Sequence, residues 1–297
     1  MRWSFLILVG LATARPRDEL FDAIFYGDVE GVKSLLETRR AEVLRAGHAP
    51  IDVNRLDSEH DRTSIMMCGM YDPDDATEDR TPVVDKSCRE IASLLLKEGV
   101  DLLHRDKYGW SVLHHAAVRG FTQMVGFLVE DGQVPLDELD NEGFSPLMRA
   151  AGGGWLDTVK VLLESGASFR LGDAKGRTAL HLVVQMAVVE PRYVSYLKGV
   201  LTLLPKAALE LSDDNGRTPL HFALIGKGSH EAAEVLLEAG ADSRSKDAFG
   251  VSAYHMASSE RTRSLVAEFN ARASEMEIRA ARKQQKETSE SMSRREL

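Results

Sequence analysis

The sequence predicts an all-α solenoid of stacked helix-turn-helix units, and three observations support this prediction. An Asp-x-x-Gly phrase recurs five times in one register, at 106–109, 140–143, 173–176, 213–216 and 247–250. The glycines of successive phrases are 34, 33, 40 and 34 residues apart. Two residues after each glycine, a Ser or Thr opens a second four-residue phrase. A period near 33 residues is typical of stacked copies of one supersecondary unit.

The first repeat is a helical pair without the turn phrase. The segment 20–27 and the apolar residues that follow it to Leu36 predict two helices, and 38–50 extends the second until Gly47 and Pro50 end it. A first repeat has no neighbour before it. The missing phrase is therefore expected of an N-terminal cap.

The second repeat departs most from the pattern. Asp61 stands where the other turns have glycine. The segment 71–87 is an insertion rich in Asp and Glu, and the second helix of this repeat is expected to follow it and to end at Gly99.

The remaining repeats follow the register. They span 106–139, 140–171, 173–211, 213–243 and 247–269. The repeat at 173–211 carries about six extra residues around Pro191, which must break the helix there because proline has no backbone N–H to donate. The segment 270–297 is charged and has no sustained apolar stripe, so we expect a helix that frays into a disordered tail.

The residue types at the fixed positions of one repeat have physical reasons. Glycine at the fourth turn position allows a positive φ without a steric penalty. The Ser or Thr that follows caps the first helix, and proline at the next position loses no hydrogen bond. Each leucine that buries against the next repeat contributes about 1.5–3 kcal/mol. No repeat covers its own apolar face, so several must stack.

The second phrase resembles a known signature. Ser111-Val112-Leu113-His114 and Thr218-Pro219-Leu220-His221 are similar to the Thr-Pro-Leu-His phrase of ankyrin repeats. The resemblance covers 20–269 and implies a solenoid of about seven helix-turn-helix units joined by β-turn or hairpin loops. It implies a non-catalytic scaffold or adaptor that binds a protein partner. The alternative is a regulatory or substrate-presenting subunit of an enzyme complex.

Composition narrows the function further. The chain is 43% hydrophobic and 28% charged, which allows a core to form, and its net charge is −9. This charge disfavours non-specific binding to nucleic acid or to an anionic membrane. No catalytic arrangement of side chains stands outside the structural register, so we expect neither an enzyme nor a cofactor. We expect the chain to be a monomer.

The N-terminal segment 1–14 resembles a secretory signal peptide. Arg2 precedes an apolar stretch, 3–11, and Ala12-Thr13-Ala14 has the small-x-small pattern of a cleavage site, with cleavage after Ala14. The stretch is too short to span a membrane, which needs about 20 apolar residues. The alternative is an apolar extension packed on the first helices. The predicted organisation is therefore a signal peptide at 1–14, a repeat array at 15–269 and a tail at 270–297.

These termini predict a location in the secretory pathway, either the lumen of the endoplasmic reticulum or outside the cell. Arg294-Arg295-Glu296-Leu297 resembles the Lys-Asp-Glu-Leu retrieval signal, with Arg295 where that signal has an acid. The alternatives are a plain charged chain end and a cytoplasmic protein, since the ankyrin family is mostly cytosolic or nuclear.

Four histidines invite a zinc hypothesis. They are His114, His181, His221 and His255, at one equivalent position of four repeats. Packed helices lie about 10 Å apart, whereas zinc ligands lie about 2 Å from the metal. We therefore expect no metal site. The resemblance implies that these histidines bond to neighbouring backbone and tie each turn to its helix.

Cys68 and Cys88 are the only cysteines. They bracket the acidic insertion, and in an oxidising compartment a disulfide between them would close that loop. The ankyrin pattern places Cys68 on the first helix and Cys88 at the start of the second, which leaves two reduced, partly buried thiols as the alternative.

The register also predicts a binding surface. In ankyrin-like arrays the turn tips and the first helices form a concave recognition surface. The residues beside each turn glycine supply an aromatic patch and then a basic strip, and aromatic residues and arginine are common interface hot spots. His115 is expected to point to the same concave face. The candidate partner-binding residues are Tyr108, Trp110, His115, Phe144, Lys175, Arg177 and Arg217.

Overall fold

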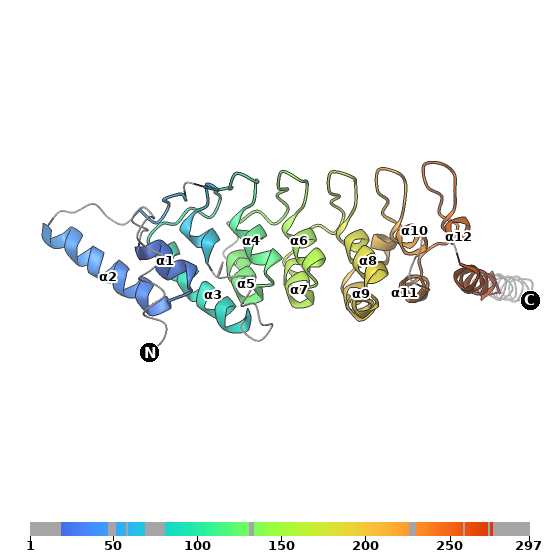
Figure 1. The fold of residues 1–297 in the computed structure, drawn as a ribbon, viewed down its shortest axis with the longest axis horizontal. Helices are drawn as coiled ribbons and strands as arrows, with labels where there is room; N and C mark the ends of the chain where they lie inside the picture. Colours follow the sequence, from blue (N-terminus) through green and yellow to red (C-terminus); the bar gives the residue numbers. More distant parts are fainter. Residues whose placement is uncertain are drawn as a thin grey trace, which may run out of the picture. The chain divides into compact units, whose positions relative to one another are not determined.

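The computed structural model describes residues 19–46, 52–57, 59–68, 81–130, 134–225, 230–257, 259–272 and 274–275. In these residues helices are joined by turns, with two isolated β-bridges and no strand. The chain divides into two compact units, unit 1 (Met1–Ser168) and unit 2 (Phe169–Leu297). Within each unit the turn loops project on one side of the helices (Figure 1). The predicted all-α fold class is confirmed.

Unit 1 stacks the first repeats of the chain. Its described elements are α1 (Glu19–Phe25), α2 (Val29–Ala46), the 3₁₀ helix η1 (Ser64–Met67), α3 (Thr81–Lys97), α4 (Val112–Val118), α5 (Thr122–Glu130), α6 (Pro146–Gly153) and α7 (Leu156–Glu164). First helices pack on first helices, as η1, α4 and α6 do, and second helices on second helices, as α3, α5 and α7 do.

Unit 2 repeats this arrangement. Its described elements are α8 (Ala179–Val189), η3 (Pro191–Tyr193), α9 (Val194–Leu203), η4 (Lys206–Glu210), α10 (Pro219–Leu224), α11 (His230–Ala239) and α12 (Ala253–Met256), and 260–272 is also helical. The first helices α8, α10 and α12 pack in order, and α9 packs on α11. The break predicted at Pro191 is confirmed, because α8 ends at Val189 and a 3₁₀ turn leads into α9.

One carboxylate oxygen organises each turn. Asp106 Oδ1 accepts the backbone N–H groups of Tyr108 and Trp110, both at 2.9 Å. Gly109, between them, has φ 77°, in the region that favours glycine. The same two bonds recur at Asp140, Asp173, Asp213 and Asp247. The turn is therefore specified locally, within five residues.

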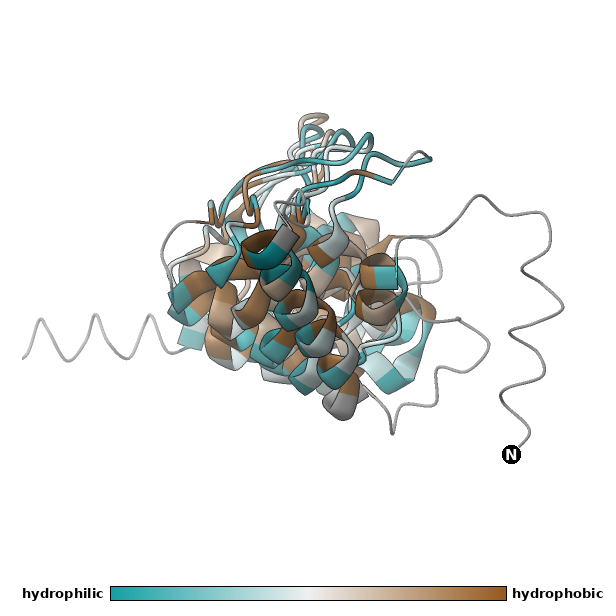
Figure 2. Cartoon of the chain, turned by 90° about the vertical axis from the view of Figure 1, so that its left-hand side faces the viewer, coloured by the Kyte–Doolittle hydropathy of each residue, from teal (hydrophilic) through white to brown (hydrophobic). Residues whose placement is uncertain are grey.

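The core consists of the apolar faces between stacked helices. Leu113, Leu128, Leu162, Leu180 and Leu220 are among the side chains that are fully buried. The helices carry most of the apolar residues, whereas the turn loops are mostly hydrophilic (Figure 2). Among the described helices, none is long and apolar enough to cross a membrane.

The helix α3 corrects the predicted insertion at 71–87. This helix already begins at Thr81, so 81–87 belongs to the second helix of the repeat. The rest of the predicted insertion, 71–80, lies outside the described residues. Thr81-Pro82 resembles the Ser/Thr-Pro pairs at the starts of α6 and α10, and the acidic composition of the segment obscured this signal.

The predictions for the two ends of the chain lie largely outside the described residues. The signal segment 1–14, the cleavage position after Ala14 and the signal-like Arg294–Leu297 all fall there. The predicted tail, 270–297, is described only at 270–272 and 274–275, and these residues are helical.

Asp61 is the one described non-glycine residue with positive φ, at 56°. It occupies the position of the turn glycine, as the sequence indicated, and a left-handed conformation costs a residue with a side chain about 1–2 kcal/mol. Glycine also has more conformational entropy than aspartate in the unfolded chain, and this offsets part of the stability gained by relieving the strain. We expect Asp61→Gly to raise the free energy of unfolding by about 0.5–1 kcal/mol in urea titrations.

A matched control is Asp214→Gly. Asp214 is also an exposed turn aspartate, but its φ is not positive, so glycine there should lower stability. Equal effects of the two substitutions would show that backbone strain at Asp61 is not the cause.

Candidate protein-interaction surface

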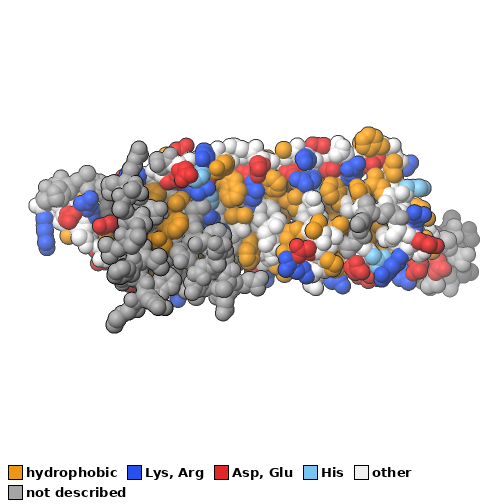
Figure 3. All heavy atoms as spheres, in the orientation of Figure 1, with side chains coloured by type: hydrophobic (Ala, Val, Ile, Leu, Met, Phe, Trp, Pro, Cys, Tyr) orange, Lys and Arg blue, Asp and Glu red, His pale blue; other side chains and the backbone are white. Residues whose placement is uncertain are grey.

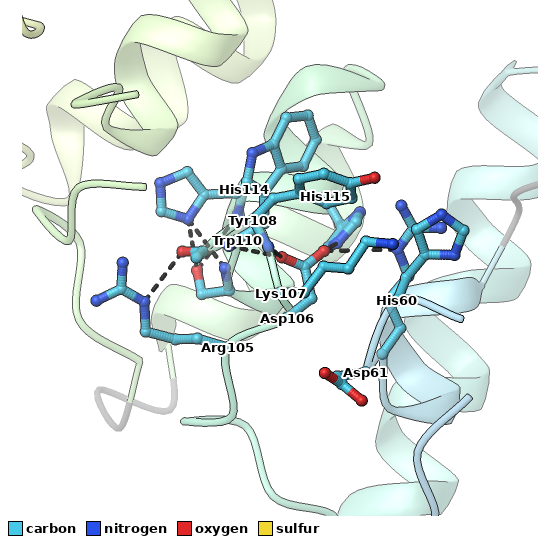
Figure 4. Close-up of polar contacts among 12 residues, drawn as sticks. His60, Asp61, Arg105, Asp106, Lys107, Tyr108, Trp110, His114 and His115 are labelled. Atoms are coloured by element: carbon cyan, nitrogen blue, oxygen red, sulfur yellow. Dashed lines mark hydrogen bonds and ion pairs between the residues drawn. The ribbon is translucent and has the colours of Figure 1, made fainter. Parts of the chain in front are cut away.

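In unit 1 the tips of successive turns are joined by backbone hydrogen bonds. Lys107 N–H donates to the His60 carbonyl at 3.1 Å, and Asn141 N–H donates to the Tyr108 carbonyl at 3.0 Å. Tyr108 is 46% exposed, and the Lys107 ammonium lies 5.1 Å from the centroid of its ring. Figure 4 shows Lys107 extending toward His60. Tyr108 is thus an exposed aromatic residue at a turn tip.

Trp110 and Phe144 lie on either side of an arginine of their own chain. The Arg149 Cζ is 4.6 Å from the centroid of the Trp110 ring and 4.3 Å from that of Phe144. Arg149 Nε donates to Asp140 Oδ2 at 2.8 Å, and its Nη2 donates to Glu142 at 2.6 Å. Both rings are half-buried. The faces expected to anchor an apolar partner are therefore already in contact with a guanidinium.

The prediction that His115 points outward is wrong. Its side chain is 4% exposed, and its Nε2 lies 3.0 Å from Asp106 Oδ2 (Figure 4). Burial lowers the pKa of His115 to about 4. Burial alone would raise the pKa of Asp106, but hydrogen bonds from His115 and from backbone N–H groups lower it to about 2. His115 therefore ties α4 to its turn and is not accessible to a partner.

In unit 2 the three predicted cations differ in their contacts. Lys175 is exposed. Arg177 is held by Asp173, to which it donates through both Nε and Nη2, and it also reaches Gln185. Arg217 is half-buried and forms no ion pair within the described part of the chain. Of the three predicted cations, only Lys175 and Arg217 are thus available to bind a partner.

Two exposed apolar turn residues were absent from the predicted site. Phe249 is 73% exposed and Val251 is 37% exposed, on either side of Gly250 in the last turn. Apolar, basic and acidic side chains mix along the edge that the turns form (Figure 3). The register itself could have identified these two residues, because they occupy the positions of Tyr108 and Trp110.

The buried histidines have the structural role that the resemblance implied. Ser111 N–H donates to His114 Nδ1 at 3.1 Å, so that nitrogen carries no proton, and Nε2 donates to the Phe144 carbonyl at 3.0 Å. His181 makes the same pair of bonds, to Thr178 N–H and to the Arg217 carbonyl. Within the described residues, no three His, Cys, Asp or Glu side chains gather as metal ligands would.

Cys68 and Cys88 form a disulfide, with their Cα atoms 5.7 Å apart. The ankyrin pattern placed Cys88 at the start of the second helix. Because α3 begins at Thr81, Cys88 lies instead well inside that helix, and both cysteines are buried. They line one small cavity with His115 and Arg119.

Comparisons with known proteins agree with the repeat pattern. The family described as ankyrin repeats in three copies matches residues 83–173, 133–198 and 168–247, which together span more than half of the chain. The crystal structure of the ankyrin repeat domain of Bcl-3 matches with a TM-score of 0.66 at 19% identity. It covers 86% of this chain and 100% of that one. At that identity the likeness shows the fold alone.

Two curated relatives are similar in sequence. The chain is 34% identical over 156 residues to the nuclear factor NF-kappa-B p105 subunit of Gallus gallus, which is 52% of this chain but only 15% of that protein. It is 32% identical over 159 residues to the probable 26S proteasome regulatory subunit p28 of Saccharomyces cerevisiae, 52% of this chain and 67% of that protein.

Proposed function

Because the chain belongs to the ankyrin-repeat family, we propose that it is a non-catalytic scaffold that binds a segment of another protein. The observation that carries the proposal is the exposure of large apolar side chains at the turn tips, Tyr108 in unit 1 and Phe249 in unit 2. Both residues precede a turn glycine and lie outside the buried core, and aromatic residues are frequent binding hot spots.

The test uses a photo-crosslinking amino acid at one position at a time in the full chain. At Tyr108 or Phe249 we expect covalent adducts with a specific protein. Lys160 on α7 is the matched control, because it is equally solvent-accessible but lies on a second helix, away from the turns. Adducts formed as readily from Lys160, or absent from both tips, would contradict a binding surface along the turns.

We propose that the array comprises about seven repeats over 15–269, the first a cap and the last degenerate. The helical pairs α4/α5 and α6/α7 in unit 1 and α10/α11 in unit 2 support this count, since each corresponds to one Asp-x-x-Gly phrase.

We propose further that the protein enters the secretory pathway, as a lumenal or secreted protein. The apolar stretch 3–11 and the Cys68–Cys88 disulfide support this, because disulfides persist in oxidising compartments. A mature chain that starts at Arg15 and is protected from protease in sealed microsomes is the expected result. An intact Met1 with full protease access would make the protein cytoplasmic.

A second candidate function is a regulatory or substrate-presenting subunit of an enzyme complex. The favouring observation is the similarity to a protein named as a probable proteasome regulatory subunit, two thirds of which this chain covers. A stoichiometric catalytic companion in a native pull-down would favour this candidate over a free scaffold.

A further inference from the structure

Two arginines in unit 2 occupy the same place in their repeats but differ in their contacts. Arg177 and Arg217 each follow the turn glycine and lie four residues after a turn aspartate. Arg177 donates to Asp173 Oδ2 through Nε at 2.8 Å and Nη2 at 2.6 Å, and its Nη1 reaches Gln185 at 3.2 Å. The guanidinium of Arg177 is therefore committed within its own chain.

Arg217 makes none of these contacts. Its Nε is buried without an acceptor, and its guanidinium forms no hydrogen bond or ion pair within the described part of the chain. A guanidinium is always charged, and a buried donor without an acceptor is unfavourable. A free carboxylate can accept from a guanidinium through two parallel hydrogen bonds. At Arg177 both donors share one oxygen, Asp173 Oδ2, because Oδ1 accepts backbone N–H groups. Because Nε is buried, a carboxylate from outside the chain would bind Arg217 through its two terminal nitrogens, Nη1 and Nη2, on this half-buried side chain.

The turn next to the one that carries Arg217 presents exposed apolar side chains. Ala248 N–H donates to the Asn215 carbonyl at 2.8 Å, so the turn that carries Arg217 is joined to the turn that carries Phe249. Phe249 and Val251 are the exposed apolar residues of that second turn. A segment that places a carboxylate on Arg217 can therefore place an apolar side chain on Phe249.

The acids near Arg217 limit how the site can select its partner. Asp213 and Asp247 are more than nine-tenths buried, and each accepts two backbone N–H groups. Asp214 is exposed, and its N–H donates to the carbonyl of Lys175, which is also exposed. These three acids outnumber Lys175, so no positive field surrounds Arg217. Recognition of an acid must therefore come from the two-pronged geometry of the guanidinium and not from a positive field.

Unit 1 has one arginine at the equivalent turn position, Arg62, which follows Asp61, and its Nε is already paired with Asp106 Oδ2 at 3.5 Å. Arg149 is bonded to Asp140 and Glu142 and lies between the rings of Trp110 and Phe144. Its charge is already paired, and its guanidinium already contacts both rings.

We propose that Arg217, Phe249 and Val251 bind a partner segment in which an acidic side chain is followed by an apolar one. Arg217 binds the carboxylate, and the two apolar residues bind the neighbouring side chain. This inference rests on the proposed function, and it assigns the cation to Arg217 and not to Arg177.

The test selects a random 12-residue peptide library on the immobilised full-length chain. Affinities of the enriched peptides are then measured by fluorescence polarisation for the wild type and for the variants Arg217→Ala, Arg177→Ala and Phe249→Ala. We expect peptides that contain Asp or Glu next to an apolar residue. Arg217→Ala should weaken their binding at least about tenfold, and Arg177→Ala should change it less than about twofold.

Arg217→Lys provides a second variant that keeps the charge but loses the two-pronged geometry. It should also weaken binding, and it keeps the test decisive if Arg217→Ala does not fold. Enriched peptides that bind Arg217→Ala and Phe249→Ala as tightly as the wild type would overturn this inference and leave the proposed function intact. Enrichment of basic peptides would overturn it in the same way. If no peptide binds the wild-type chain, the proposed function itself fails.

Discussion

Reduction of the Cys68–Cys88 disulfide is expected to lower the free energy of unfolding by about 3 kcal/mol. The two cysteines are 20 residues apart in sequence, and the bridge joins the end of η1 to the middle of α3. A crosslink of that span restricts the unfolded chain and so removes a small part of the conformational entropy that unfolding gains. Both cysteines are buried, so the bridge is also part of the packing between these helices.

The measurement is urea unfolding of the full chain with and without dithiothreitol. The double variant Cys68→Ala with Cys88→Ala is the control, since dithiothreitol should leave its stability unchanged and it should resemble the reduced wild type. A thiol assay on the unreduced, denatured protein should detect no free thiol. Two free thiols, or unfolding curves that dithiothreitol does not shift, would contradict the prediction.

Acidification from pH 7.5 to 5 is expected to lower the free energy of unfolding by at least about 2 kcal/mol. In the folded chain, burial lowers the pKa of His115 from 6.5 to about 4. Above pH 6.5 the histidine is neutral in both states, and its contribution to stability is complete. Between pH 6.5 and about 4 only the unfolded chain takes up the proton, so stability falls with pH at up to about 1.36 kcal/mol per unit.

Other buried histidines act in the same direction. Burial lowers the pKa of His114, His181 and His221 as well, so each adds to the loss of stability as the pH falls below 6.5. The lowered pKa values of Asp106 and Asp173 matter only at lower pH, because carboxylates lose their stabilising charge below about pH 4.

Two matched variants distinguish the contribution of His115 to the pH dependence of stability from that of the other histidines. His115→Gln retains a donor for Asp106 and removes the titrating ring, so its stability should fall less steeply with pH than that of the wild type. His255→Gln is the control, because His255 occupies a repeat position equivalent to His114 but is exposed. Its pH dependence should match the wild type. A stability that is flat between pH 7 and 5 would contradict the assignment of these buried neutral histidines.

Most of the fold could be predicted because the turn phrase is a local device. The backbone N–H groups of Tyr108 and Trp110 donate to Asp106 within a span of five residues, so each turn can be recognised from a short stretch of sequence. The break at Pro191 was predictable for the same reason. The start of α3 at Thr81 was missed, because a strongly acidic segment suggested a loop and hid the hydroxyl-proline start beside it.

The candidate site was harder to predict because it depends on contacts between repeats. The contact of Arg149 with the Trp110 ring joins residues from neighbouring repeats, and no spacing along the chain indicates it. The burial of His115 was missed for another reason, since its bond to Asp106 lies within one repeat but joins α4 to the turn across nine residues. Sequence can assign a residue to a turn or a helix, but it does not show which neighbour already occupies its polar or aromatic groups.

A binding loop must hold its conformation and must also present side chains to a partner, and at a turn aspartate different groups meet these two requirements. Because Asp213 fixes its turn through the main chain alone, the side chains on either side of Gly216 take no part in holding the loop's conformation. Substitutions at those outward positions can therefore change what the surface recognises at little thermodynamic cost to the scaffold. The turn at 213–216 thus keeps its conformation independently of the side chains that it presents, whereas at 173–176 the outward Arg177 is also bonded to the turn aspartate.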